Sequence, residues 1–246
     1  MLDLNKIYYQ DCLEGMKLID DKSIDMILCD LPYGTTACKW DSIIDLNKLW
    51  TEYNRIIKNN CPIVLFAAQP FTSILVLSNI NNFKYDWVWN KHIPRNFINA
   101  KRMPMQKHES VLVFGNSKLN YYPQMIKRDK PVTVKNYSKK NKDSAYKLNQ
   151  DGSNLKSYTY THRNPDTIIE GYWEANGGKL HSTQKPVSLC EYLIKTYTNE
   201  GDLILDNCAG SGSTLIAARN LNRRFIGFEN NEEYYKIACH RVGQIN

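Results

Sequence analysis

The chain has 246 residues, of which 42% are hydrophobic and 23% are charged, a balance typical of a globular protein. No apolar run reaches the roughly 18 residues of a membrane span, and the N-terminal segment lacks the pattern of a signal peptide. We therefore expect a cytoplasmic protein without a membrane anchor. The seven cysteines are scattered without Cys-x-x-Cys spacing, which argues against a disulfide framework and against a metal site of the zinc type.

Apolar runs alternate with segments of helical spacing along residues 1–115. Strands are predicted over residues 6–11, 24–29, 62–68, 85–89 and 110–114, and helices over residues 12–19, 46–58 and 70–77. The run from Ile24 to Cys29 is apolar almost throughout, which predicts a strand that is buried on both faces. A basic segment from Lys91 to Lys107 is expected to be a loop between the last two strands.

The composition changes over residues 116–180, where apolar periodicity fades and Lys, Asn, Ser and Tyr dominate. Between Lys118 and Arg163 there are eleven Lys and Arg residues against three Asp, with six tyrosines among them. Basic residues interleaved with aromatic ones suit a polyanion that has stackable bases. A solvated, partly mobile loop is the alternative interpretation.

Predicted helices and strands alternate again after Pro186. A helix is predicted from this proline onward, followed by a strand over residues 203–205, a helix over 213–221, a strand over 224–228 and a helix over 232–242. Alternating strands and helices predict an α/β fold with a mostly parallel sheet and helices on both faces. Residues 116–180 would then be an insertion between two halves of one domain, 1–115 and 181–246.

A glycine-rich turn between two acids predicts a nucleotide-type binding unit. Asp206 ends one predicted strand, Gly210 and Gly212 follow it, and Glu229 ends the next strand, 23 residues after Asp206. Glycines let the main chain approach a ligand closely, and an acid at the second strand end can accept hydrogen bonds from ribose hydroxyls. Asp206 disfavours a pyrophosphate and favours a cationic ligand such as S-adenosylmethionine. A plain glycine-rich turn is the alternative.

The turn Asp30-Leu31-Pro32-Tyr33 follows the buried run that ends at Cys29. An exocyclic amine of adenine or cytosine is a poor nucleophile, because its lone pair is delocalised into the ring. A carboxylate and a main-chain carbonyl that accept its two N–H groups localise that pair, and an aromatic ring can stack on the extruded base. Asp30, the carbonyl of Leu31 and Tyr33 supply these parts. An ordinary β-turn after a strand is the alternative.

Together these segments resemble the DNA amino-methyltransferases, which methylate adenine N6 or cytosine N4 with S-adenosylmethionine. The segment 30–33 is similar to their catalytic Asp-Pro-Pro-Tyr motif, with Leu31 in place of the usual proline. Residues 206–214 resemble their cofactor loop, and residues 181–186 resemble a third family element. The catalytic motif precedes the insertion, which precedes the cofactor loop. This circularly permuted order is that of the beta group, and it implies a Rossmann-like fold with a target-recognition insertion.

The resemblance also implies roles for individual residues. Its catalytic set is Asp30, Leu31, Pro32 and Tyr33. Its cofactor set is Asp11, Cys12, Asp30, Thr183, Lys185, Asp206, Gly210, Gly212, Ser213 and Glu229, in which Glu229 holds the ribose and Asp11 contacts the cofactor adenine. Two alternatives stay open: Asp11 could only cap a helix, and Lys185 could only form an ion pair. Asp rather than Ser at position 30 favours adenine over cytosine as the target.

The implied partner is double-stranded DNA. We expect phosphate contacts from Lys91, Arg95, Lys101, Arg102, Lys139, Lys140 and Lys142. A homodimer and a cognate restriction endonuclease that acts on the same site are further expectations from the resemblance. The alternatives are a cytosine N4 methyltransferase, an enzyme acting on RNA or on a protein glutamine, and a catalytically silent nucleic-acid-binding subunit.

Overall fold

One large sheet organises the main body of the chain. The structure, a computed structural model, describes residues 2–34, 42–135, 157–172 and 184–244. Within these residues eight strands pair in the order β1-β10-β9-β2-β3-β5-β4-β8. They are β1 (Lys6–Tyr9), β2 (Met26–Asp30), β3 (Ile63–Ala67), β4 (Phe83–Arg95), β5 (Gln106–Phe114), β8 (Ile168–Ile169), β9 (Leu203–Asp206) and β10 (Arg224–Glu229). Only β5 runs against its neighbours in this sheet, so the predicted mostly parallel α/β fold is confirmed.

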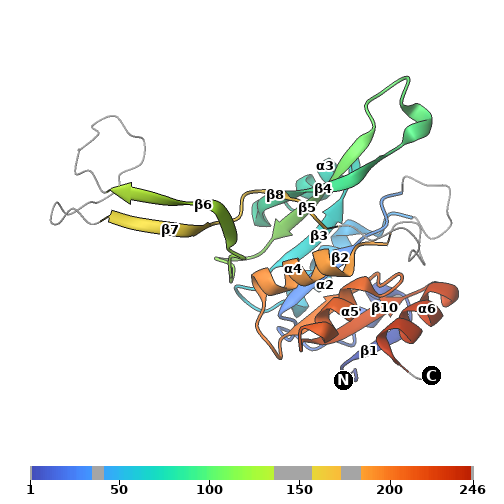
Figure 1. Ribbon diagram of the computed structural model, residues 1–246. Coiled ribbons are helices and arrows are strands. Elements are labelled where there is room, and N and C mark those ends of the chain that lie inside the picture. Colours follow the sequence, from blue (N-terminus) through green and yellow to red (C-terminus); the bar gives the residue numbers. More distant parts are fainter. Residues whose placement is uncertain (1, 35–41, 136–156, 173–183, 245–246) are drawn as a thin grey trace. The chain divides into compact units, whose positions relative to one another are not determined.

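Helices cover both faces of the sheet (Figure 1). One face carries α1 (Cys12–Met16), α2 (Leu46–Ile56) and α3 (Phe71–Ser78), and the other carries α4 (Val187–Tyr197), α5 (Ser213–Asn220) and α6 (Glu232–Val242). Side chains alternate along a strand, so Met26 and Leu28 of β2 pack under α4–α6, whereas Ile27 and Cys29 pack under α1–α3. No helix in the described residues is long and apolar enough to cross a membrane.

Strands β4 and β5 extend further than the sequence predicts. They continue to pair beyond the sheet, with Asn90 opposite His108 and Arg95 opposite Gln106, across an irregular register. A 3-10 helix at Phe97–Asn99 (η2) follows β4. Much of the expected loop from Lys91 to Lys107 is therefore a two-stranded arm. The pattern conceals it because the outer part of the arm packs on no core, so apolar and polar residues do not alternate there.

The basic middle segment contains a second, two-stranded sheet. Strands β6 (Ile126–Lys135) and β7 (Ser157–Arg163) pair in antiparallel fashion, and residues 123–165 form a compact unit of their own. This unit is shorter than the predicted insertion over 116–180. The difference arises because the N–H of Tyr122 donates to the carbonyl of Thr196, and because β8 pairs with β4 in the large sheet.

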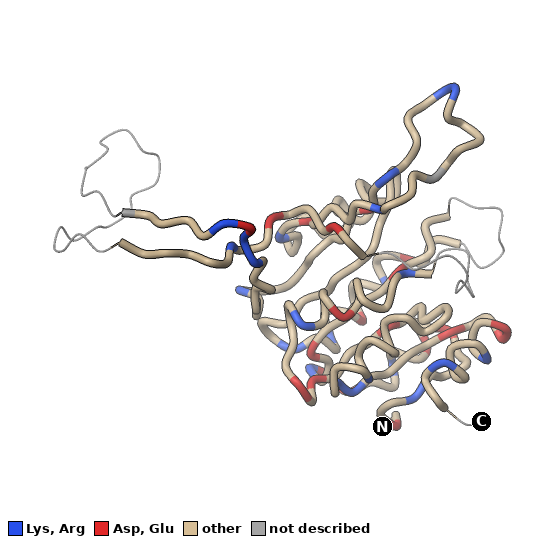
Figure 2. The backbone as a smooth tube through the Cα atoms, in the orientation of Figure 1, with Lys and Arg blue, Asp and Glu red and all other residues tan. Residues whose placement is uncertain are grey.

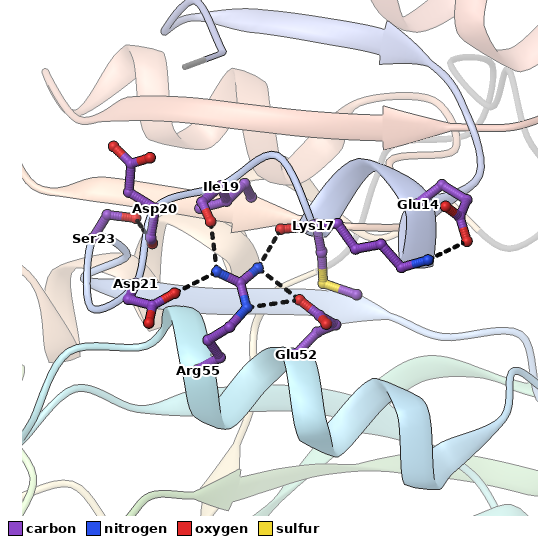
Figure 3. A network of polar contacts seen from close by, with 9 residues as sticks. Glu14, Lys17, Ile19, Asp20, Asp21, Ser23, Glu52 and Arg55 are labelled. Carbon is purple, nitrogen blue, oxygen red and sulfur yellow. Dashed lines mark hydrogen bonds and ion pairs between the residues drawn. The ribbon is translucent and has the colours of Figure 1, made fainter.

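Arg55 fixes the end of α1 against α2 (Figure 3). Its guanidinium donates to the main-chain carbonyls of Met16 and Ile19, and it forms ion pairs with Asp21 and Glu52 at 2.6 Å each. The helix predicted over residues 12–19 ends early, at Met16, and the chain continues as a turn as far as Ile19. Arg55 satisfies carbonyls at this helix end that would otherwise need water or a cap.

Candidate functional site

A pocket of about 320 Å³ opens at the carboxyl ends of the parallel strands. Four acids at or just after strand ends line it: Asp11 after β1, Asp30 on β2, Asp206 on β9 and Glu229 on β10. Parallel strands bring their carboxyl ends to one edge of a sheet, which explains why segments far apart in the sequence meet here. The turn that begins at Asp30 and the glycine-rich turn therefore share one cavity.

Both carboxylate oxygens of Asp30 already receive a hydrogen bond. The hydroxyl of Tyr33 donates to Oδ1 at 2.7 Å, and Nζ of Lys185 donates to Oδ2 at 2.5 Å. The ring of Tyr33 stacks on Phe71, with ring centroids 5.4 Å apart and planes inclined by 24°. Burial raises the pKa of the Tyr33 hydroxyl well above its usual value, and the nearby carboxylate of Asp30 raises it further, so Tyr33 remains a donor. Each oxygen of Asp30 keeps a second lone pair for another donor.

Two further pocket-lining residues, Lys185 and Glu109, continue a chain of alternating charges from Asp30. Lys185 lies between Asp30 and Glu109, 3.3 Å from Oε2 of Glu109, and Lys91 pairs with the other oxygen of Glu109. Burial lowers the pKa of Lys185, but the carboxylates of Asp30 and Glu109 outweigh burial and raise it above its usual value. Burial raises the pKa of Glu109, and the two lysines more than reverse this. Lys185 and Glu109 therefore both stay ionised at neutral pH.

The glycine-rich turn leaves open space beside the pocket. Gly210 and Gly212 have φ angles of 51° and 81°, in the left-handed region that favours glycine. Gly210 lines the pocket, and a Cβ atom built there would meet no protein atom within 4 Å. The first residues of α5, Ser213 and Thr214, also line the pocket. A helix N-terminus and an open main-chain turn thus face the same cavity.

The two acids that flank this turn are buried. Burial raises the pKa of Asp206 to about 7, although the N–H of Cys208, which lies 3.2 Å from Oδ1, lowers it. Burial also raises the pKa of Glu229, against hydrogen bonds from the N–H groups of Asn231 at 2.8 Å and Gly210 at 2.7 Å. Asp206 therefore titrates near neutral pH, and its charged form would gain from a cationic ligand.

Asp11 both lines the pocket and caps a helix. Its Oδ1 accepts from the N–H groups of Leu13 and Glu14 at 2.9 and 3.2 Å, at the N-terminus of α1. Cys12 lies beside it in the pocket wall. The helix-cap interpretation of Asp11 is thus observed, and it is compatible with a ligand contact from the same residue.

The pocket gathers most of the predicted catalytic and cofactor residues. Those that line it are Asp11, Cys12, Asp30, Leu31, Pro32, Tyr33, Lys185, Asp206, Gly210, Ser213 and Glu229. Gly212 is not in the lining: a Cβ there would lie 3.2 Å from that of Ala238, so this glycine allows close packing of the turn on α6. Thr183 lies outside the described residues.

The predicted phosphate contacts fall into three groups. Lys91 is paired with Glu109 and its side chain is only 16% exposed, and its contact with phosphate stays a prediction. Lys101 and Arg102 are exposed near the end of the arm, and Arg95 is the last residue of β4. Lys139, Lys140 and Lys142 lie outside the described residues.

Glu109 and Asn207 are among the pocket residues that the predicted site sets did not include. Glu109 lines the pocket at the start of the apolar run of β5, and an acid where a buried strand begins is the signal that could have identified it. Asn207 also lines the pocket, and its Oδ1 accepts from the hydroxyl of Tyr53 at 2.5 Å. Tyr53 lies on α2, far away in the chain, so no local pattern predicts that contact.

The chain is similar to known proteins over nearly its whole length. The family profile of the N6/N4 DNA methylases matches residues 24–240. The type II methyltransferase M1.MboII of Moraxella bovis is 27% identical, with 100% of this chain and 99% of the relative covered. The type II methyltransferase M.HinfI of Haemophilus influenzae is 26% identical over 98% of this chain and 69% of the relative.

Solved structures have the same fold. The M1.HpyAVI–SAM complex superposes with a TM-score of 0.62 at 24% identity, covering 96% of this chain and 98% of the other. The cytosine-N4-specific PvuII DNA methyltransferase superposes with a TM-score of 0.67 at 16% identity, covering 96% and 85%. The family match, together with a catalytic-type turn and a glycine-rich turn in one pocket, assigns the chain: it belongs to the N6/N4 DNA methylase family.

Proposed function

We propose that the chain is a site-specific DNA methyltransferase that transfers a methyl group from S-adenosylmethionine to the N6 amine of an adenine flipped out of duplex DNA. The observation that carries the proposal is the convergence of the Asp30 turn with the glycine-rich turn between Asp206 and Glu229 in one pocket. A pocket of about 320 Å³ is within the size range of small-molecule sites.

The donor set around the pocket fits S-adenosylmethionine. When bound, the cofactor supplies a methyl group on a positively charged sulfur. Asp206 suits the ammonium group of its methionine end, and Glu229 suits the ribose hydroxyls. The left-handed turn at Gly210 offers open space for close approach of the ligand to the main chain. Asp11, the N-cap of α1, and Cys12, the first residue of that helix, remain our candidates for the adenine contact.

Lys185 takes a different role from the one that the resemblance implies. Its ammonium group is held by Asp30 and Glu109, and a second cation beside it would be repelled. We therefore assign Lys185 to positioning the Asp30 carboxylate rather than to holding the cofactor.

The Asp30 turn would activate the target amine. Asp30 accepts one N–H of the amine and the carbonyl of Leu31 accepts the other, which localises the lone pair on nitrogen and makes it a better nucleophile. Tyr33 offers its ring to the flipped base, and Pro32 stiffens the turn. Catalysis then rests on positioning and on electrostatics at the amine. Asp rather than Ser at position 30 supports adenine as the target.

Basic surfaces support a duplex DNA substrate (Figure 2). Lys101 and Arg102 are exposed on the arm, and the hairpin of β6 and β7 carries Lys127, Arg128 and Lys130. Such residues bind phosphates without reading sequence. A homodimer, a restriction endonuclease that acts on the same site, and a cytoplasmic location stay predictions from the family resemblance.

A transfer assay with radiolabelled S-adenosylmethionine tests the proposal. The purified protein is offered unmethylated duplex plasmid DNA, total RNA and a protein extract in separate reactions, with cofactor binding measured by calorimetry. We expect label in duplex DNA alone. Label in RNA or protein but not in DNA would contradict the substrate class, and cofactor binding without transfer to any of them would favour a silent subunit.

A further inference from the structure

The end of the β4–β5 arm exposes two large apolar side chains. Phe97 is 81% exposed and Ile98 is 94% exposed, and Ile93, Met103 and Met105 nearby are also exposed. Water penalises such surface, and contiguous apolar groups on a protein surface commonly mark a contact with a partner. No core within the described residues covers these two side chains, so folding does not explain their apolar character.

Hydrogen bonds within the turn fix the segment that carries Phe97 and Ile98. Asn96 has a left-handed conformation, its carbonyl accepts from the N–H of Asn99 at 3.1 Å, and its side-chain oxygen accepts from the amide of Asn99 at 2.8 Å. The N–H of Ala100 donates to the carbonyl of Phe97 at 3.0 Å. These bonds hold the turn through its polar groups and leave the two apolar side chains pointing to solvent.

The arm is basic as well as apolar. Residues 92–108 contain no Asp or Glu and include Arg95, Lys101, Arg102 and Lys107. Figure 2 shows basic residues at the far end of the arm, where Lys101 and Arg102 are exposed. This charge suits a polyanion, and like-charge repulsion disfavours the same arm of a second copy.

The arm projects from the edge of the sheet at which the pocket opens. β4 runs parallel to β3, so its carboxyl end extends past the carboxyl edge of the sheet. At the base of the arm, Glu109 stands opposite Trp89 in the register of β4 and β5, and it lines the pocket. Arg95 lies opposite Gln106, three residues from Glu109 along β5, so the paired part of the arm reaches about 10 Å beyond Glu109, a length comparable with the width of a DNA groove.

We propose that Phe97 and Ile98 form an apolar wedge that enters the base stack of duplex DNA beside the target base, while Lys101 and Arg102 hold the flanking phosphates. This inference rests on the proposed function, because it requires a DNA substrate. Apolar side chains inserted between base steps unstack the duplex, and unstacking lowers the cost of moving the target base into the pocket.

The test compares two duplexes of one sequence. Native protein first methylates plasmid DNA, and sequencing maps the modified site. One synthetic duplex then carries that site with the normal partner base opposite the target, and the other carries an abasic residue opposite it. The variant is Phe97→Ala/Ile98→Ala. The matched control is Leu77→Ala, which is 73% exposed at the end of α3, just before β4 begins at the opposite edge of the sheet.

We expect Phe97→Ala/Ile98→Ala to lower kcat/KM roughly ten- to a hundredfold on the paired duplex and less than about threefold on the abasic duplex, where little stacking opposes flipping. Native Tm and native cofactor affinity show that the variant is folded. Leu77→Ala should match the native protein on both duplexes. Lys101→Ala/Arg102→Ala should lose activity equally on both, because phosphate contacts do not depend on pairing.

Three results would overturn the wedge. Native activity of Phe97→Ala/Ile98→Ala on the paired duplex would show that these side chains do not assist base flipping. An equal loss of activity on both duplexes would show that Phe97 and Ile98 only contribute to DNA binding. A smaller particle mass of this variant than of the native protein in light scattering would assign Phe97 and Ile98 to a contact between copies of the chain. If the native protein methylates no DNA at all, the proposed function fails together with the wedge, whereas the other outcomes remove the wedge alone.

Discussion

Asp30 is the residue at which chemistry and cofactor binding can be separated. We expect Asp30→Ala to reduce methyl transfer by about a thousandfold or more, because the target amine loses the acceptor that localises its lone pair. The affinity for S-adenosylmethionine should stay within about threefold of native, since Asp206 and Glu229 remain and Lys185 keeps Glu109 as a partner. Single-turnover transfer and calorimetry give the two numbers. Loss of cofactor binding in this variant would place Asp30 in the cofactor site instead.

Asp206 gives the site a pH dependence with a definite sign. Its pKa is about 7 in the folded protein against an ordinary value of 3.8, so the folded state binds more protons than the unfolded chain between these values. This group therefore makes the unliganded protein less stable as pH rises from about 4 to 7. A cationic ligand prefers the ionised carboxylate, so its affinity changes in the opposite direction.

For S-adenosylmethionine we expect the dissociation constant to fall by up to about tenfold per pH unit as pH rises toward 7 and to level off above it. Asp206→Asn should bind more weakly and show a flatter profile. Calorimetric titrations between pH 5.5 and 8 measure both curves. A native profile that is flat over this range would contradict a charge contact between Asp206 and the cofactor.

Glu109 is a positioning residue in our account, because it acts on Asp30 through Lys185. Glu109→Gln keeps the shape but leaves two lysines without their shared carboxylate, and we expect the free energy of unfolding at pH 7 to fall by about 3–5 kcal/mol. The pKa of Glu109 is lowered in the folded state, so its stabilising effect is present above its ordinary value of 4.5 and is lost as pH falls further. Urea denaturation at pH 7 and at low pH should therefore show a difference from native that shrinks in acid.

Kinetics distinguish a positioning role of Glu109 from a purely structural one. If Glu109 positions Asp30, the folded Glu109→Gln variant has a lower kcat while its KM for S-adenosylmethionine stays near native. Equal stability of native and Glu109→Gln at pH 7, or a change in KM alone, would remove Glu109 from this role.

Among the secondary-structure elements, α1 is fixed at its C-terminal end by the side chain of Arg55. Arg55 is 28% exposed and donates to two carbonyls at the end of α1 while pairing with two carboxylates, so Arg55→Ala should lower the free energy of unfolding by about 1–3 kcal/mol. Because α1 begins beside Asp11 in the pocket wall, cofactor affinity should fall as well. Lys17→Ala is the control from the same region: Lys17 forms an exposed pair with Glu14 and should leave the denaturation midpoint unchanged. Equal midpoints for both variants would contradict the anchoring role.

The strands show how far sequence patterns reach. The apolar run that becomes β2 predicts its strand correctly, because burial on both faces forces nearly every side chain to be apolar. The outer part of β4, beyond Asn90, packs on no core and carries no such pattern, so it was predicted to be a loop. The two-residue strand β8 is predicted by nothing local, since it exists only through its pairing with β4.

As with the strands, part of the site could be predicted from the sequence and part could not. Asp30, Asp206 and Glu229 stand at strand ends, where parallel topology must bring them to one edge, so their meeting in a pocket follows from the sequence. The partners of Lys185 could not be inferred in this way. Glu109 comes from the antiparallel strand β5, and its position opposite Lys185 depends on how the arm leaves the sheet.

At the scale of the whole molecule, the pocket and the basic arm and hairpin are formed mostly by different elements. The large sheet provides one pocket with four acids at its edge, and basic residues occur in the arm and in the hairpin of β6 and β7 as well as on the main body (Figures 1 and 2). A cofactor site and a polyanion-binding surface are the two parts that methyl transfer to DNA requires. We propose that the pocket joins these parts to methylate an exocyclic amine of adenine.

The identity of the methylated nucleoside tests this claim most directly. The purified protein is incubated with S-adenosylmethionine and unmethylated duplex DNA, and the DNA is then digested to nucleosides for mass spectrometry, with Asp30→Ala as the negative control. We predict N6-methyladenine from the native protein and none from the variant. N4-methylcytosine in its place would contradict adenine as the target, and a methyl group on carbon, or no methylated nucleoside at all, would contradict amine methylation by this pocket.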